Sequence, residues 1–332
     1  MKYNKNNKTQ YYLILKIIYH ERYIMNEFQK VINEVKKVVN GKDRAIVTTL
    51  LAILSNGNIL IEDIPGVGKT TMALAFSKAL GLDYGRVQFT PDTLPSDITG
   101  YVIYNKDTGK MTYNKGAIFC NLFLADELNR TSSRTQAALL EAMEEQQVTV
   151  EGVSHKLETP FSVIATQNPV GASGTQLLPD SQTDRFTVRI SMGYPNPDDE
   201  CQMLLNRTKG NPLDTVKTVI TKEQLIDIQQ KVREVYVNKE IAQYIVSLVN
   251  STRNSRFISR GASPRATLSL TDMAKAVAFA NDRDYIIPKD IGNIFVSTLN
   301  HRVILSAEAT SSKMSENVVL NNIYGQIKPP RI

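Results

Sequence analysis

A short glycine-containing turn carries the residues best suited to chemistry. Residues 59–61 are apolar, as expected of a buried strand, and Gly66-Val67-Gly68-Lys69-Thr70 follows them at a helix start. In such a turn, backbone N–H groups and the helix N-terminus face an anion, the lysine reaches the outer phosphates and the threonine can hold Mg²⁺. The pattern predicts a nucleoside triphosphate site. The alternative is an ordinary strand-to-helix turn with a chance Lys-Thr pair.

Position 63 departs from the usual phosphate-loop pattern, which has glycine there. This chain has Asp63. The position lies at the start of the turn, where glycine relieves backbone strain without touching phosphate, whereas Gly66 and Gly68 lie where the backbone approaches the ligand. The acid places negative charge near the phosphates, so its effect on affinity is open at this stage.

Two carboxylates follow a second apolar run. Residues 122–125 read as a buried parallel strand, and Asp126 and Glu127 come at its carboxyl end, where open α/β sheets bind ligands. Because successive strand residues point in opposite directions, we expect separate roles. We assign Asp126 to the Mg²⁺ shell through water and Glu127 to polarising the attacking water. The pair also suits the N-terminus of a helix at 133–146, and the two interpretations are compatible.

A polar amide ends a third apolar run. Residues 161–166 read as a strand, and Gln167-Asn168-Pro169 follows. Asn168 can hydrogen-bond the attacking water or the γ-phosphate. The alternative is a turn residue that caps the next segment.

The elements that position these residues alternate between strand and helix. This alternation predicts a doubly wound parallel sheet of the α/β class in a core domain at 25–194. Prolines at 195 and 197 end the pattern, and helical periodicity continues through a small all-helical lid at 197–308. We expect strands near 58–62, 85–89, 121–126, 161–166 and 186–191, and lid helices near 198–207, 221–234, 238–251, 263–281 and 288–300.

Other segments interrupt or flank this pattern. Residues 102–113 and 148–157 read as inserted β-hairpins, either contacts with a substrate or loop decoration without function. The stretch 171–179 is a loop rich in Gly, Ser and Thr. The tail at 309–332 is polar, and we expect it to be poorly ordered.

Composition narrows the class of protein. The chain has 332 residues, 42% of them hydrophobic, and a net charge of +6. Residues 1–24 carry five basic residues and one acid, so the remaining chain is nearly neutral and makes no case for nucleic-acid binding. The cysteines and histidines form no metal or disulfide pattern and fit a reducing cytoplasm, which is the expected location.

The first 24 residues form an extension to the predicted core. Residues 11–19 are apolar apart from Lys16, but a membrane span needs ~20 apolar residues, so we expect no stable membrane insertion. A signal peptide lacks a clear small-residue cleavage site here. We expect Met25 to be the true start, because the predicted first helix follows it.

These pieces, in this order, resemble an AAA+ ATPase, and in detail the MoxR family. The similarity runs from about Val39 to about Arg302, and its strongest part is 116–189. From Gly116 the chain reads Gly-Ala-Ile-Phe-Cys-Asn-Leu-Phe-Leu-Ala-Asp-Glu-Leu-Asn-Arg, with Ala165-Thr-Gln-Asn-Pro and Asp184-Arg-Phe further on. The family's phosphate loop often reads Glu-Asp-x-Pro-Gly-x-Gly-Lys-Thr, so Asp63 looks like a family trait.

The resemblance implies roles for further residues. Asn168 matches the sensor-1 position, Arg185 matches the arginine finger that reaches a neighbouring subunit's nucleotide, and Arg265 matches the sensor-2 arginine of the lid. Arginine suits such roles because it stays charged and grips phosphate oxygens bidentately. A helix start at Ser263-Pro264 would aim Arg265 back at the phosphates. The resemblance places ATP against Val39, Gly41, Pro65, Gly66, Val67, Gly68, Lys69, Thr70 and Thr71.

The resemblance also implies a function. It predicts an ATPase that uses Mg²⁺, works as a hexameric ring and remodels or activates a partner, often a protein with a von Willebrand factor A domain. Metal or cofactor insertion is one form of that role. Two alternatives remain: a nucleotide-gated binding platform with slow hydrolysis, and a DNA-acting AAA+ protein. The nearly neutral body counts against DNA.

Overall fold

The structure is a computed structural model that describes residues 25–107, 109–168, 178–208 and 210–331. The 1–24 extension and most of the predicted loop at 171–179 lie outside these ranges. Among the residues that are described, no helix is long and apolar enough to cross a membrane.

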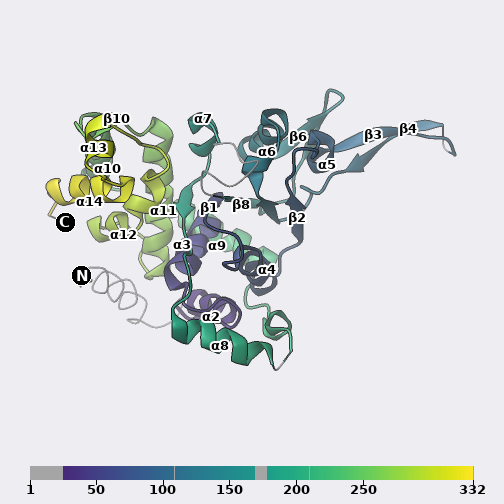
Figure 1. Cartoon of the computed structure of the whole chain (residues 1–332), viewed down its shortest axis with the longest axis horizontal. Helices are drawn as coiled ribbons and strands as arrows, with labels where there is room; N and C mark the ends of the chain where they lie inside the picture. The colour runs from purple at the N-terminus through teal and green to yellow at the C-terminus, as the bar shows by residue number, and fades with distance from the viewer. Residues whose placement is uncertain (1–24, 108, 169–177, 209, 332) are drawn as a thin grey trace.

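A five-stranded parallel sheet forms the centre of the core (Figure 1). The strand order is β2-β5-β8-β1-β9, so segments far apart in sequence become neighbours. This confirms the predicted doubly wound α/β fold and brings the carboxyl ends of β1, β5 and β8 to one edge. The strands are β1 (Ile59–Glu62), β2 (Tyr84–Gln88), β5 (Leu122–Asp126), β8 (Ser162–Gln167) and β9 (Val188–Ile190).

Alternation along the strands gives each face of the sheet its own core. Ile59, Ile61 and Leu122 pack with helices α2, α3 and α4 in one hydrophobic cluster, whereas Leu60 and Phe123 pack with α6 in another. Burial on both faces explains why β5 and β8 read as continuous apolar runs. The helices are α2 (Met25–Lys36), α3 (Asp43–Leu54), α4 (Lys69–Ala79) and α6 (Ser133–Glu145).

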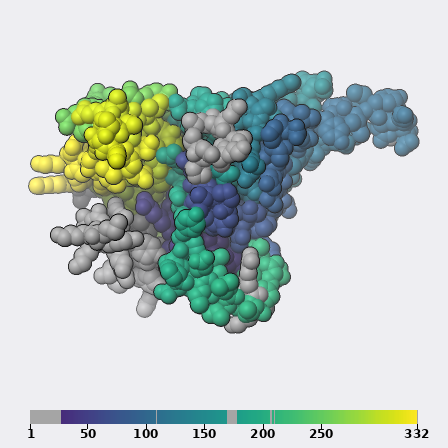
Figure 2. Space-filling view, viewed as in Figure 1, coloured from purple at the N-terminus to yellow at the C-terminus, as the bar shows by residue number. Residues whose placement is uncertain are grey.

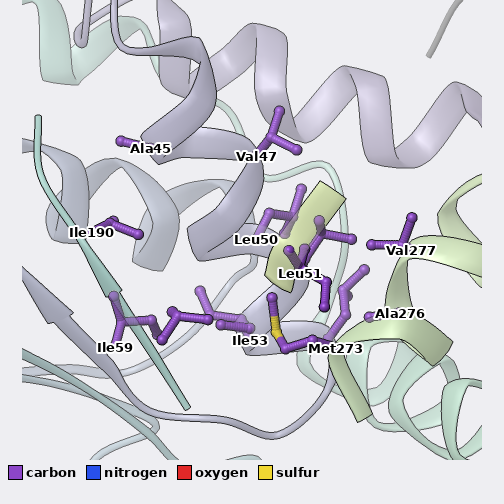
Figure 3. Packing of buried hydrophobic residues seen from close by; sticks show 14 of the residues in the cluster. Ala45, Val47, Leu50, Leu51, Ile53, Ile59, Ile190, Met273, Ala276 and Val277 are labelled. Carbon is purple, nitrogen blue, oxygen red and sulfur yellow. The ribbon is translucent and has the colours of Figure 1, made fainter. Parts of the chain in front are cut away.

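Helix α3 joins the core to the lid. Figure 3 shows its buried side chains between Ile59 and Ile190 of the sheet and Met273 and Val277 of α11 (Pro264–Ala280). Helix α3 also contacts α9 (Lys222–Glu234). The two domains therefore share one continuous hydrophobic cluster.

The lid bundle begins later in the chain than the predicted lid and also ends later, because it excludes α8 (Pro197–Arg207) and includes α14 (Glu316–Gln326) (Figure 1). Helix α11 contacts α10 (Lys239–Arg253) and α12 (Pro288–Leu299). Helix α8 lies apart from this bundle (Figure 1). Its Asp199 approaches Gly41, where an added Cβ would lie 1.9 Å from the Asp199 Oδ2 atom.

The expectation of a poorly ordered tail at 309–332 is wrong. Helices α13 (Ala307–Ser311) and α14 (Glu316–Gln326) occupy this stretch, and α14 packs on α10 and α12. Its Leu320 and Ile323 are buried, and the Tyr324 ring lies 5.6 Å from that of Phe295. Asparagines and a glycine dilute this apolar stripe, which made the segment read as polar.

Both predicted hairpins are present. Strands β3 (Gly100–Asn105) and β4 (Lys110–Lys115) form one, which follows α5 (Pro95–Thr99) and projects far from the body in Figures 1 and 2. Strands β6 (Gln147–Val150) and β7 (Val153–Lys156) form the other. The rings of Tyr113 and His155 stack at 3.9 Å, so the hairpins contact each other near their bases.

Candidate active site

The phosphate loop runs from the end of β1 to the first turn of α4. Gly66 and Gly68 adopt left-handed conformations, with φ of 85° and 96°, which glycine accepts without strain. The Lys69 Nζ atom donates to the carbonyl oxygens of Asp63 and Ile64, at 2.6 and 3.1 Å. Burial lowers the pKa of Lys69, and nearby carboxylates oppose that shift. The ammonium group thus lies folded over its own loop, held by neutral partners that an anionic ligand would outcompete.

Asp126 lies beside Thr70, the residue with which the sequence predicts that it shares a metal ion. The Thr70 Oγ1 atom lies 3.5 Å from the Asp126 Oδ2 atom, and Thr166 donates to Oδ1 at 2.8 Å. Arg86 of β2 also donates to Oδ2, at 2.8 Å. Sequence reasoning missed Arg86, because only the pairing of β2 with β5 brings it to this edge.

Glu127 and Asn168 come together at the tips of adjacent strands. The Asn168 Nδ2 atom donates to Glu127 Oε1 at 3.1 Å, and Arg130 pairs with Oε2 at 3.0 Å. The Glu127 backbone is left-handed, with φ of 59°, and its N–H donates to Thr166. Left-handed backbone at a residue other than glycine is strained, and such strain is typical of functional sites.

Asn129 holds the backbone of Asn168 through both its N–H and its carbonyl group. Its Nδ2 atom donates to the Asn168 carbonyl at 3.2 Å, and its Oδ1 atom accepts from the Asn168 N–H at 3.3 Å. The Asn168 Oδ1 atom is buried and makes no hydrogen bond to the described residues. A buried acceptor of this kind requires a partner, and a ligand or water in the site would supply one.

A cavity of about 370 Å³ adjoins the phosphate loop. It is bounded on one side by Val39 and its neighbours and on another by Tyr194, Pro195 and α8. Pro65, Gly66, Val67, Gly68 and Thr71 complete the wall, so these predicted ATP contacts surround one space. Gly41 lies next to it, with φ of 68°.

The Asp63 carboxylate is satisfied by backbone donors rather than left facing the phosphates. Its Oδ2 atom accepts from the N–H groups of Met192 and Gly193, each at 2.6 Å. Burial by itself would raise the pKa of Asp63, but these and two further hydrogen bonds lower it below its ordinary value. The acid is therefore built into the fold as a carboxylate.

Arg185 and Arg265, the arginines predicted for the finger and lid roles, both contact the side chain of Glu144. Arg185 follows α7 (Asp180–Thr183), and its Nη1 atom lies 3.3 Å from Glu144 Oε2, while Arg265 contacts Glu144 Oε1. Neither arginine lines the cavity beside the phosphate loop. The sequence predicts that the start of α11 aims Arg265 at the phosphates, whereas here Arg265 contacts Glu144 near the end of α6, and its sensor role stays a prediction.

Contacts between lid and core fix this arrangement. Ser263, at the start of α11, donates to the Asp184 carboxylate at 2.8 Å, and Arg260 pairs with Asp180 at 2.5 Å. Arg302 donates to the Phe186 carbonyl at 2.6 Å. The segment that carries Arg185 and the helix that carries Arg265 are thus tied together.

The residues present fit ATP with Mg²⁺. The loop offers backbone donors and Lys69 for phosphates, and the unpaired Asn168 acceptor lies beside Glu127. Among the described residues, no group of three or more acidic, His or Cys side chains could hold a metal alone. Mg²⁺ often needs no such group, because it uses one or two protein ligands together with phosphates and water.

A parallel sheet with a phosphate loop, an adjacent Asp-Glu pair and a helical lid defines a P-loop nucleotide-binding protein. Residues 58–188 match the family described as ATPase family associated with various cellular activities (AAA), and 250–323 match the AAA lid domain. The chain belongs to the MoxR family of AAA+ ATPases.

Individual relatives cover most of the chain. It is 44% identical to the uncharacterised protein YeaC of Bacillus subtilis over 87% of its length and 91% of the relative's. It is 33% identical to Chaperone MoxR1 of Mycobacterium tuberculosis, over 88% and 79% respectively. The crystal structure of a candidate ATPase of Cytophaga hutchinsonii superposes with a TM-score of 0.84 at 36% identity, covering 99% of this chain and 100% of that one. ATP hydrolysis is a property of the family, and a chaperone-like role accords with the named relative.

Proposed function

We propose that this protein hydrolyses ATP with Mg²⁺ and uses the resulting motion to remodel or activate a partner protein. The observation that carries the proposal is the pairing of Glu127 with Asn168 beside the phosphate loop. A carboxylate oriented by an amide can take a proton from water, and the same amide can hold that water in line.

The remaining residues bind and orient the nucleotide. Lys69 and the loop N–H groups bind phosphate, while Thr70 and, through water, Asp126 hold Mg²⁺. The metal ion supplies neutralisation of phosphate charge. Asn129 and Arg130 keep Asn168 and Glu127 in place.

The two arginines support a site shared between subunits. Arg185 and Arg265 meet on Glu144, away from the cavity beside their own phosphate loop. We infer that both act on the nucleotide of a neighbouring copy, in a closed homo-oligomer that we take to be a hexameric ring. The guanidinium groups would then balance the charge that spreads over the γ-phosphate oxygens.

The client is the least constrained part of the proposal. A partner with a von Willebrand factor A domain, and metal or cofactor insertion as the outcome, rest on the family alone. The projecting hairpin β3–β4 exposes Tyr104 and Met111, which suits contact with a polypeptide. A nucleotide-gated platform in the cytoplasm is the second candidate. ATP turnover that rises with a partner protein and not with DNA favours remodelling.

Two lysine variants test the nucleotide site. Lys69→Ala should lose ATP binding, measured by titration calorimetry with Mg²⁺ present. Lys239→Ala is the matched control, because Lys239 is exposed at the start of α10 and lies outside the cavity lining. Tight ATP binding by Lys69→Ala would count against the proposed site.

A further inference from the structure

We propose that Asp63 is a positioning residue that fastens the chain leaving the sheet to the phosphate loop and thereby shapes the base pocket. The proposal deepens the function above and rests on it, because the pocket is taken to hold the nucleotide's base. It also gives the departure from glycine at position 63 a physical cause.

Both oxygens of the Asp63 carboxylate accept hydrogen bonds, and most of these come from one segment, residues 191–193. Oδ2 accepts from Ser191 Oγ at 2.9 Å and from the Met192 and Gly193 N–H groups, each at 2.6 Å. Oδ1 accepts from the Ile64 N–H at 2.9 Å. Asp63 is only 7% exposed, so these are charge-assisted hydrogen bonds shielded from water.

The backbone of residues 191–193 is shaped to receive a carboxylate. Gly193 has a φ of 62°, which turns its N–H to the same side as that of Met192. Consecutive N–H groups that converge in this way form an anion-binding concavity. Here the anion is a side chain of the protein itself.

A second hydrogen bond holds Gly193, and it comes from Lys42 on another wall of the cavity. The Lys42 Nζ atom donates to the Gly193 carbonyl at 2.8 Å, and Lys42 immediately follows Gly41. Asp63 therefore binds the N–H group of Gly193, and Lys42 binds its carbonyl oxygen. Directly after Gly193 come Tyr194 and Pro195, which line the cavity together with Glu200 and Met203 of α8.

The contacts of Asp63 predict different effects on the two ends of the nucleotide, the phosphates and the base. Three of the four hydrogen bonds to the Asp63 carboxylate come from residues 191–193, and the fourth comes from the Ile64 N–H, ahead of the loop glycines and Lys69. Loss of the carboxylate should therefore free residues 191–195, loosen the pocket and spare the phosphate cradle. Glycine at position 63 restores the usual loop pattern, yet we expect it to impair nucleotide binding.

Three variants of the full chain test this. Asp63→Gly removes the tether, Asp63→Asn keeps the size but replaces one acceptor oxygen with a donor, and Asp198→Asn removes a neighbouring exposed charge as the matched control. Amide hydrogen exchange at Met192 and Gly193 measures the tether without nucleotide. Competition by ATP, GTP and inorganic triphosphate measures the two ends of the ligand.

Asp63→Gly and Asp63→Asn should raise exchange at both amides by about tenfold or more. ATP affinity should fall about tenfold and the preference for ATP over GTP should shrink, with triphosphate affinity changed by less than about twofold. Unchanged exchange in both variants would overturn the tether. Equal losses for ATP and triphosphate would overturn the link to the base. A wild-type protein that binds neither ATP nor triphosphate would overturn the proposed function instead, and exchange would still report on the tether.

Discussion

Both oxygens of the Glu127 carboxylate have partners, Asn168 on one side and Arg130 on the other. A carboxylate held in this way is oriented before substrate arrives, and orientation contributes much of the benefit of a catalytic base. The same contacts also compete with water for its lone pairs.

Glu127→Gln should keep ATP affinity and lose turnover by about 100-fold or more, because the amide cannot accept a proton from water. Steady-state phosphate release measures the turnover, and nucleotide titration measures the ATP affinity. Glu240→Gln, at an exposed residue in the first turn of α10, is the matched control. Turnover at the wild-type rate in Glu127→Gln would refute the assignment. If it traps ATP, affinity capture with this variant is the most direct search for the client.

At the residue scale, most of the site is readable in the sequence. Lys69, Thr70, Asp126, Glu127 and Asn168 all follow buried apolar runs, so their convergence follows from the topology of a parallel sheet. Their catalytic roles stay predictions. Arg86 and the Asp63 carboxylate contact residues from strands that are neighbours in the sheet but not consecutive in the sequence, so no local pattern predicts these contacts.

Among the elements, α14 shows how a short helix becomes part of a domain. Ser315 accepts a hydrogen bond from the Val318 N–H at the helix start, and Leu320 is fully buried against the bundle. The helix closes the side of the lid formed by α10 and α12.

Leu320→Ala should destabilise the protein by about 2–5 kcal/mol, because it removes buried methyl groups and leaves a cavity. Val318→Ala is the control on the same helix, since Val318 is 47% exposed and should change stability by less than about 0.5 kcal/mol. Urea unfolding followed by circular dichroism distinguishes them. Equal effects of the two substitutions would show that α14 does not pack as described.

Element prediction succeeded where periodicity was strong and failed where it was diluted. The sheet strands and both hairpins matched their apolar and turn patterns. The sequence predicts helix α8 but groups it with the lid, whereas the structure sets it apart from the lid bundle (Figure 1), because helical periodicity says which face is apolar and not which surface covers it.

Over the whole molecule, a buried histidine joins the lid to the core. His301 contacts the Phe186 carbonyl at 2.9 Å, with Arg302 beside it. Burial, and then the charge of Arg302, holds the pKa of His301 well below 6.5. The unfolded chain therefore binds a proton below pH 6.5 that the folded protein does not.

The free energy of unfolding should thus fall as the pH drops below 6.5, by up to ~1.4 kcal/mol per pH unit from this group. Urea unfolding at pH 7.5, 6.5 and 5.5 measures the slope. His301→Gln should reduce it, whereas His155→Gln, on hairpin β6–β7, should not. A slope that is identical in wild type and His301→Gln would contradict the assignment.

Subunit mixing tests the shared site. An Arg185→Ala protein and a Lys69→Ala protein should each be inactive, and mixtures should recover part of the ATPase activity, because some interfaces then pair an intact finger with an intact phosphate loop. Phosphate release across a series of mixing ratios measures this. Mixtures that stay inactive at every ratio would argue against action in trans.

The placement of the lid is what the sequence could not supply. Ser263-Pro264 correctly predicts where α11 begins, but the direction of Arg265 depends on tertiary contacts through Asp184 and Arg302. Local patterns fix the start of a helix and leave its target undetermined.

Hairpin β3–β4 has a further consequence, for protein engineering. Its register bonds lie within the hairpin, and its base is set by close backbone approach, since an added Cβ at Gly116 would lie 2.1 Å from the Ile98 carbonyl oxygen. Those features leave residues 103–112 as a cassette that can be exchanged while Tyr113 keeps its contact with His155 and the central sheet is unchanged. Chimaeras that exchange this cassette between relatives would test whether the hairpin sets client preference.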